Sequence, residues 1–312
     1  MVEKSRHSSP IQHGFPHLEM VRQSVTALFR RLSADGVRSY DTSFAPADAA
    51  FRPSDDLYLG AHRVASSMVR ALRLPDARIV VGFRAMEEAA TVELTAGPEY
   101  FVEVNDRFRV HRRDLAAALA HEVTHVLLHR LDLRFPTTEA NEILTDTAAA
   151  YLGAGWLLLD AYREDELTHQ KLGYLTPEEF GYVLAKRGRL LGEDLSAWFT
   201  SPQAYEAYVR GRALADQDLR RAPLAAADRP ARRRYLRDRR AGGAAPGQGA
   251  AYRFEEHGRG GGSAGSTECG GGGGLRVSFP CPVCEQRLRL PAYGGAVRAR
   301  CGLCHTVLEC DT

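Results

Sequence analysis

The stretch Leu115-Ala-Ala-Ala-Leu-Ala-His121-Glu122-Val-Thr-His125-Val-Leu-Leu-His129 contains the pattern His-Glu-x-x-His, with no Pro or Gly to interrupt it. Its alanines and leucines are strong helix formers, so the stretch predicts a helix. Residues four apart leave the same face of a helix, so His121 and His125 can bind one metal ion. Glu122 lies beside that face, where a carboxylate can take a proton from a water molecule that zinc has made more acidic.

The next predicted helix, which starts at residue 137, offers a third ligand. Thr137 or Thr138 is a suitable N-cap, and acidic residues occupy the first turns. Glu142 and Asp146 are four residues apart and share a face. A catalytic zinc ion takes three protein ligands and keeps its fourth position for water. Glu142, 17 residues after the second histidine, can be the third ligand. Asp146 can accept the spare ring N–H of a ligand histidine and fix its tautomer.

Together, His121-Glu122-Val-Thr-His125 and Asn141-Glu142-Ile-Leu-Thr-Asp146 resemble the signature of the gluzincins, the thermolysin-like zinc metallopeptidases. The resemblance covers about residues 115–152, and the gap between the two patterns is shorter than in thermolysin. It implies that His121, His125 and Glu142 hold a catalytic zinc ion, that Glu122 is the general base, and that Asp146 positions a ligand histidine. The implied activity is hydrolysis of peptide bonds in a peptide or protein substrate by zinc-activated water.

Other ligand sets fit the sequence less well. A metzincin has a glycine turn and a third histidine soon after the second, whereas the equivalent position here is Leu131, with no glycine nearby. His129 continues the histidine stripe, but it is two turns, about 12 Å, from His121, too far to share one zinc ion. We expect His129 to be partly exposed or to support the site from outside. A site of two histidines and a glutamate would also accept other divalent ions.

Three strands are predicted directly before the His-Glu helix, at residues 78–84, 90–95 and 99–104, and Gly97-Pro98 is a turn signal. We expect them to form a small antiparallel sheet. Zinc peptidases usually keep here the edge strand that pairs with an extended substrate. By that resemblance, Glu99–Asn105 is the candidate substrate-binding edge, and an ordinary covered strand is the alternative.

The helix that carries Asp146 is predicted to continue to about Asp160. Tyr151 should point away from the zinc ion, because nine positions from Glu142 amount to about half a turn. His169 and Tyr174 lie in a predicted loop, where either could donate a proton to the leaving group or stabilise an oxyanion.

The last cysteines form two Cys-x-x-Cys pairs, Cys281/Cys284 and Cys301/Cys304, separated by 16 residues. This spacing is typical of a tetrahedral thiolate site on one structural zinc ion. Short alternating runs around the pairs predict strands, so the segment resembles a zinc ribbon. Each pair is followed by Glu285 or His305, where ribbons often have glycine. Cys269 and Cys310 fall outside the pattern and are predicted free thiols, although Cys310 or His305 could serve as a substitute ligand.

Composition sets the broad class of the protein. The 312 residues are 44% hydrophobic, enough for a substantial core, and the net charge of +2 implies no global attraction to nucleic acid or membrane. No window approaches a membrane-spanning helix, and the N-terminus lacks the apolar region of a signal peptide. We therefore predict a cytoplasmic protein without membrane contact, in which a reducing environment keeps the cysteines available for metal.

These features predict an α+β fold: a mainly helical zincin-like core with a small antiparallel sheet before the His-Glu helix, plus a small β zinc ribbon. The predicted parts are a disordered lead at 1–16, a metallopeptidase domain at 17–228, a basic then Gly-rich flexible linker at 229–274, and the ribbon at 275–312.

Two functions remain open. The first is a zinc metallopeptidase with one catalytic and one structural zinc ion, whose ribbon recruits a substrate or partner. The second is a non-catalytic or sensor protein with a zincin scaffold, whose ribbon and arginine-rich run at 229–240 contact nucleic acid or a protein partner. Glu122 favours the peptidase, because a scaffold does not need a base beside the metal.

Overall fold

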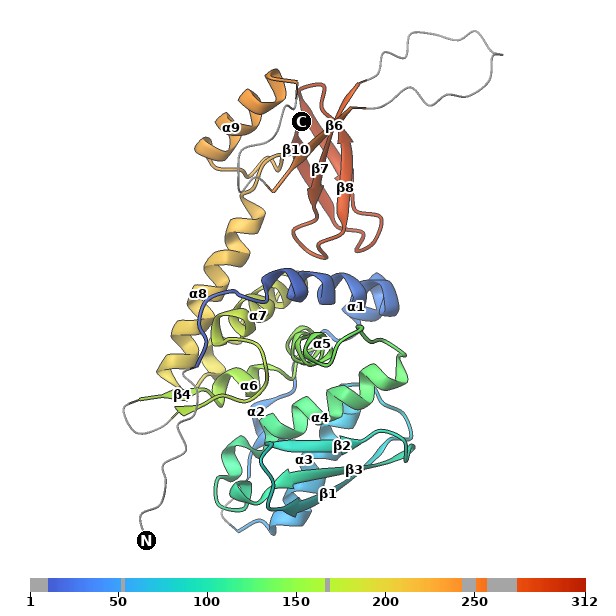
Figure 1. Ribbon diagram of the computed structural model, residues 1–312, viewed down its shortest axis with the longest axis vertical. Helices are drawn as coiled ribbons and strands as arrows, with labels where there is room; N and C mark the ends of the chain where they lie inside the picture. The colour runs from blue at the N-terminus through green and yellow to red at the C-terminus, as the bar shows by residue number, and fades with distance from the viewer. Residues whose placement is uncertain (1–10, 52–53, 166–168, 243–250, 257–273) are drawn as a thin grey trace, which may run out of the picture. The chain divides into compact units, whose positions relative to one another are not determined.

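The computed structural model describes residues 11–51, 54–165, 169–242, 251–256 and 274–312 (Figure 1). They fall into two compact units, Met1–Leu214 and Ala215–Thr312. Helices and small sheets together confirm the predicted α+β class. The predicted domain boundaries themselves stay a prediction.

The N-terminal unit is built around α4 (Leu115–Arg130), which lies between α5 (Thr138–Tyr151) and the strand β2 (Ala90–Glu93) (Figure 1). Because neighbours pack on nearly every side, 12 of its 16 residues are buried, which explains its run of alanines. The remaining helices of this unit are α1 (Leu18–Arg38), α2 (Pro46–Ala49), α3 (Leu57–Ala71), α6 (Trp156–Asp160), α7 (Pro177–Leu191) and α8 (Pro202–Leu219), the last of which crosses into the second unit.

The sheet before α4 is mixed, with strand order β1-β3-β2, where β1 is Arg78–Arg84 and β3 is Glu99–Asn105. β1 and β3 are parallel, and only β2 is antiparallel to β3, so the predicted purely antiparallel sheet is wrong. The predicted substrate edge, Glu99–Asn105, is also wrong, because β3 is the central strand. Its alternate residues Tyr100, Val102 and Val104 are all buried, which suits a central position. The edge strands are β1 and β2.

The helix that carries Asp146 ends at Tyr151, so its predicted continuation to Asp160 is wrong. Gly153 follows with a φ of +105°, which few other residues adopt, and α6 begins at Trp156. Tyr151 is buried and packs edge to face on Phe29, with ring centroids 5.9 Å apart. Tyr151 is therefore a core residue.

Helix α7 begins with a capping box formed by Thr176 and Glu179. The Thr176 hydroxyl accepts from the Glu179 N–H, and the Glu179 carboxylate accepts from the Thr176 N–H, a complete capping box. The same helix start holds part of the predicted disordered lead: the Gly14 N–H donates to Glu178, and the Gly14 carbonyl accepts from the Thr176 hydroxyl. Residues 1–10 of that lead lie outside the described residues.

The C-terminal unit contains a three-stranded antiparallel sheet of order β6-β7-β8 and a two-stranded sheet of β9 and β10. The predicted ribbon strands are present, and the predicted linker at 229–274 contains a helix and a strand. Residues 243–250 and 257–273 of that linker lie outside the described residues. The elements are α9 (Arg229–Arg240), β6 (Arg253–Glu256), β7 (Leu275–Pro280), β8 (Arg287–Pro291), β9 (Ala296–Arg300) and β10 (Val307–Asp311).

Among the described residues, no helix has the length and apolar character needed to cross a membrane.

The buried side chain of Arg187 on α7 makes hydrogen bonds with three separate segments of the N-terminal unit. The Arg187 side chain is 0% exposed and donates to the Ser43 hydroxyl at 3.0 Å, to the carbonyls of Tyr40 and Tyr151, and to the Glu193 carboxylate at 3.1 Å. Burial lowers its pKa, and the nearby Glu193 opposes that shift. The charge is kept inside only because these acceptors surround it.

Replacing this arginine should therefore destabilise the unit. We expect Arg187→Met to lower the free energy of unfolding by about 3 kcal/mol, because Glu193 and two buried carbonyls lose their donor. Thermal unfolding followed by circular dichroism measures the change, with Arg189→Met, at an exposed position of the same helix, as control. Equal melting temperatures for the two variants would contradict a structural role for Arg187.

Candidate metal centres

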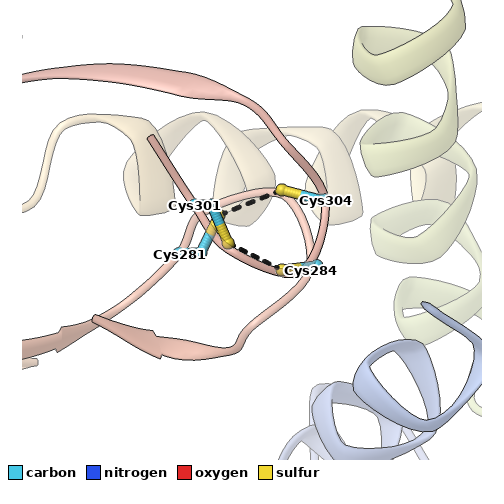
Figure 2. Close-up of side chains that lie close together, drawn as sticks. All are labelled: Cys281, Cys284, Cys301 and Cys304. Atoms are coloured by element: carbon cyan, nitrogen blue, oxygen red, sulfur yellow. Dashed lines mark hydrogen bonds between the residues drawn. The ribbon is translucent and has the colours of Figure 1, made fainter. Parts of the chain in front are cut away.

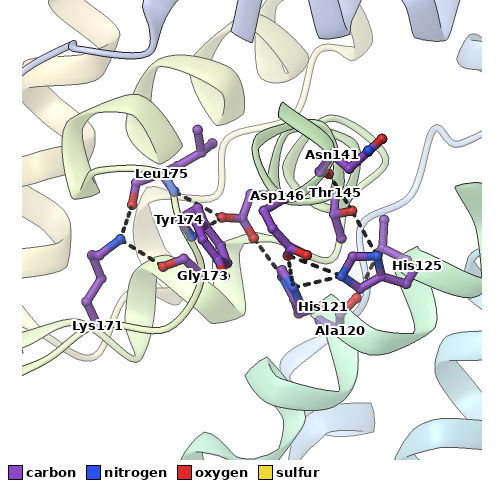
Figure 3. A network of polar contacts seen from close by, with 12 residues as sticks. Ala120, His121, His125, Asn141, Thr145, Asp146, Lys171, Gly173, Tyr174 and Leu175 are labelled. Carbon is purple, nitrogen blue, oxygen red and sulfur yellow. Dashed lines mark hydrogen bonds and ion pairs between the residues drawn. The ribbon is translucent and has the colours of Figure 1, made fainter. Parts of the chain in front are cut away.

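Helices α4 and α5 bring the three predicted ligands to one point. Figure 3 shows His121 and His125 at this point. His121 Nε2 lies 3.0 Å from Glu142 Oε2 and 3.1 Å from His125 Nε2, and His125 Nε2 lies 3.3 Å from Glu142 Oε2. Four zinc bonds of about 2.05 Å in a tetrahedron separate their ligand atoms by about 3.3 Å. The three atoms therefore fit three corners of a tetrahedral zinc site.

Hydrogen bonds on the far side of each imidazole fix its tautomer. His121 Nδ1 lies 2.8 Å from Asp146 Oδ1, and His125 Nδ1 lies 3.2 Å from the Thr145 hydroxyl oxygen. The Thr145 hydroxyl donates its own proton to the Asn141 carbonyl at 2.9 Å, so its oxygen is left to accept from His125. Both Nε2 atoms then present lone pairs to the ligand point, as metal binding requires. Thr145 was not predicted from the sequence.

Asp146 is held by the predicted loop that contains Tyr174, through contacts that sequence reasoning missed. Its side chain is 0% exposed, and Oδ2 accepts from the backbone N–H groups of Tyr174 and Leu175. Gly173 makes this approach possible: it has a φ of +80°, and a Cβ there would lie 2.6 Å from Oδ2. Lys171 closes the loop by donating to the carbonyls of Gly173 and Leu175, at 2.8 Å and 3.1 Å. A glycine 27 positions after Asp146 gives no local signal of this contact.

The turn between the two helices is fixed by Asn141. Its amide donates to the carbonyls of Phe135 and Thr137, each at 2.8 Å, and its side-chain oxygen accepts from the Phe135 N–H at 2.7 Å. Thr137 is the N-cap of α5, one of the two predicted candidates, and accepts from the Ala140 N–H. The turn therefore sets where α5 presents Glu142 to α4.

Electrostatics at the ligand point favour a cation. Burial raises the pKa of Glu142, but hydrogen bonds with His121 and His125 outweigh it and lower the pKa to about 2. Burial lowers the pKa of His121, yet its bonds to Asp146 and Glu142 raise it well above the usual value. Without a metal, a proton is thus held among these groups. A divalent cation takes its place and releases it.

Glu122 lies beside the ligand point and is 5% exposed. Burial raises its pKa, which the neighbouring His121 and His125 oppose and the carboxylate of Glu142 reinforces. It lines the same cavity as the three ligands. A buried carboxylate with a raised pKa at a metal site is suited to exchange protons with metal-bound water.

The cavity has a volume of about 930 Å³ and extends along α4 beside the edge strand β2. Residues 89–92 of the edge form one wall, and Tyr174 enters from the loop that holds Asp146. His129 lies at the cavity rim and is exposed, as predicted, rather than joining the ligands. His169 is exposed and does not line the cavity, and its Nδ1 lies 3.9 Å from Glu164 Oε1.

The four predicted cysteines form a second, closed group (Figure 2). All four side chains are buried; the Sγ atoms of Cys281 and Cys304 are 3.6 Å apart, as are those of Cys284 and Cys301. Zinc–sulfur bonds of about 2.3 Å in a tetrahedron give a separation of about 3.8 Å, so the group fits a structural zinc ion. Cys310 lies outside this group, and Cys269 lies outside the described residues.

The two cysteine turns repeat one another. The N–H of Glu285 donates to the Cys281 carbonyl at 2.9 Å, and the N–H of His305 donates to the Cys301 carbonyl at 3.0 Å. Glu285 and His305 have φ values of 61° and 62°, the left-handed region that favours glycine. These are the positions where ribbons often have glycine, so the turn geometry is kept despite the departure in sequence.

Comparison of the chain with protein-family models, with curated proteins and with solved structures found no match. The interpretation of both centres therefore depends on their own geometry.

The two ligand groups should bind zinc independently. We expect two zinc ions per chain in the purified protein, and one in each of His125→Ala and Cys301→Ser, because each substitution removes a ligand from one group only. Elemental analysis by mass spectrometry after gel filtration gives the ratio. Loss of both ions from either variant would show that the groups are coupled.

Proposed function

We propose that the protein is a zinc-dependent peptidase of the gluzincin type. The observation that carries the proposal is the position of Glu122, a buried carboxylate in the same cavity as His121, His125 and Glu142. A site that only held a metal would not need a base there. The pairing of each ligand imidazole with Asp146 or Thr145 supports the same chemistry, because it directs both Nε2 atoms to the metal position.

Zinc bound at this site would supply a water molecule of lowered pKa and would polarise the carbonyl of a peptide bond. Glu122 would accept a proton from that water during its attack on the peptide carbonyl. Its raised pKa then suits it to pass the proton to the leaving amine. Asp146 holds the His121 ring in place throughout through its contact with Nδ1.

The edge strand β2 supports a peptide as the substrate. β2 is hydrogen-bonded to β3 on one side only, and its residues 90–92 line the cavity. The outer backbone N–H and C=O groups of β2 are therefore directed toward the space where an extended chain would lie. Such a chain can add as a further strand and present successive carbonyls along α4.

Tyr174 is the better of the two predicted proton donors. It lines the cavity, whereas His169 does not, and its side chain is 50% exposed. Burial raises the pKa of Tyr174, and the carboxylates of Glu142 and Asp146 add to the shift, so the hydroxyl keeps its proton at neutral pH. A neutral hydroxyl here can donate a hydrogen bond to the oxyanion that forms on the attacked carbonyl.

The peptidase is tested by exposing an unfolded protein mixture to the parent chain and to Glu122→Gln. New peptide termini, identified by mass spectrometry, should appear with the parent and fall by at least about 100-fold with the variant, because the general base is lost. The variant should retain zinc at both sites, since Glu122 is not a ligand. If the zinc-loaded parent produces no termini, the proposal fails, and a non-catalytic zincin scaffold becomes the better explanation.

Tyr174→Phe tests the assigned hydroxyl. We expect kcat on a peptide found in the first experiment to fall by about 10- to 100-fold, because one oxyanion donor is lost while packing is kept. KM and zinc content should change little. His169→Phe is the matched control and should retain the parent rate; the reverse result would move the role to His169.

A further inference from the structure

We propose that one face of the β6-β7-β8 sheet binds single-stranded nucleic acid. This face carries Arg253, Arg276, Arg287 and Arg289, and we refer to it as the arginine face. The proposal is independent of the peptidase, because it concerns the other unit of the chain and none of the residues that line the metal cavity.

Charge is divided unevenly between the two units. Residues 215–312 contain 16 arginines, no lysine and ten acidic residues, a net charge of +6. The remaining 214 residues have a net charge of −4, so the near-neutral total conceals a basic C-terminal unit. The exclusive use of arginine suits phosphate, which a guanidinium binds with two parallel hydrogen bonds.

Strand register places the four arginines on one face. Arg253 pairs with Ser278, which pairs with Arg289 on the other side, and paired residues point to the same face. Arg276 and Arg287 lie two positions before Ser278 and Arg289, so they share that face as well. The opposite face is apolar and contains Val277 and Phe279, both buried.

The arginine face is exposed, and much of its charge is uncompensated. All four arginines are exposed. The side chains of Arg253 and Arg276 make no hydrogen bond or ion pair with other residues in the described part of the chain. Arg289 pairs with the exposed Glu255 at 3.2 Å, and Arg287 donates to the Ser278 hydroxyl at 3.1 Å, which holds its guanidinium over the middle strand.

An aromatic side chain at the end of this face favours a single strand over a duplex. Tyr293 is 76% exposed and follows β8 by two residues. A Cβ on Gly274 would lie 2.9 Å from the Tyr293 ring, which places the ring beside the start of β7. Exposed rings stack on unpaired bases, and guanidinium planes do the same, whereas a duplex hides its bases from a flat sheet.

The sequence suggested the arginine-rich run at 229–240, which forms α9, as a contact to nucleic acid or a protein partner. In the structure, part of this helix packs against the C-terminal sheets instead. Tyr235 is buried against Phe254, on the apolar side of the sheet. Arg232 forms an ion pair with Asp311, and Arg239 donates to the Thr312 carbonyl at 2.7 Å. α9 thus covers the side of the sheet opposite to the arginine face. Its exposed residues Arg233, Arg237 and Arg240 provide a matched control.

The test uses the full zinc-loaded chain and a fluorescein-labelled oligo-dT of about 20 nucleotides, long enough for one binding site. Fluorescence anisotropy is measured over a series of salt concentrations for the parent and two triple variants. One is Arg253→Gln/Arg276→Gln/Arg289→Gln, and the other is Arg233→Gln/Arg237→Gln/Arg240→Gln. Both remove three positive charges, and zinc content and circular dichroism verify that each folds.

We expect the sheet variant to bind oligo-dT at least about tenfold more weakly than the parent. The slope of log affinity against log salt concentration should become less steep by about two, since each lost phosphate contact removes about 0.7. The α9 variant should stay within about twofold of the parent. Tyr293→Ser should weaken binding to oligo-dT about tenfold, the size of one stacking contact, and leave binding to an abasic strand unchanged.

Three results would overturn the proposal. The first is a parent chain that does not bind oligo-dT at low salt. The second is an equal loss in both triple variants, which would reflect total charge instead of a defined face. The third is equal affinity for oligo-dT, the abasic strand and inorganic polyphosphate, with no effect of Tyr293→Ser, which would indicate a general polyanion surface.

Discussion

The cavity that contains the candidate metal ligands depends on the contacts of one buried side chain, the carboxylate of Asp146. It joins three segments that are distant in sequence: α4 through His121, α5 on which it resides, and the 171–175 loop through two backbone N–H groups. A charge with 0% exposure is stable only when each of its oxygens has partners. The same bonds that satisfy Asp146 therefore orient His121 and carry Tyr174 into the cavity.

Local patterns in the sequence predicted α4, the start of α5 and the side chains of the candidate metal ligands, but neither the end of α5 nor the tertiary neighbours. The four-residue spacings on α4 and α5 predicted which side chains share a face, and the structure brings those side chains together. The position of β3 could not be obtained in this way, because an alternating pattern identifies a buried face but not the neighbouring strands. The hydrogen bonds from Tyr174 and Leu175 to Asp146 join residues far apart in sequence, and no local sequence pattern predicts them.

The two candidate metal centres differ in how they are built. The ligands on α4 and α5 are positioned by helix packing and by Asp146 and Thr145, so their arrangement exists before a metal arrives. The four cysteines lie on two short turns, each with a residue in the left-handed region at Glu285 or His305. In closed four-cysteine sites of this kind, metal binding commonly supplies much of the folding free energy.

The dependence of the cysteine turns on metal also affects the β6-β7-β8 sheet, because one of these turns connects two of its strands. Cys281 and Cys284 lie between β7 and β8, so the register of Arg276 with Pro291 depends on the same turn that would bind zinc. Without zinc, the cysteine turn would no longer fix that register, and the arginines would no longer be held on one face. The histidine site would keep its shape, because helix packing positions its ligands. Zinc would then determine the fold of the C-terminal unit, whereas in the N-terminal unit it would serve the proposed activity and leave the fold unchanged.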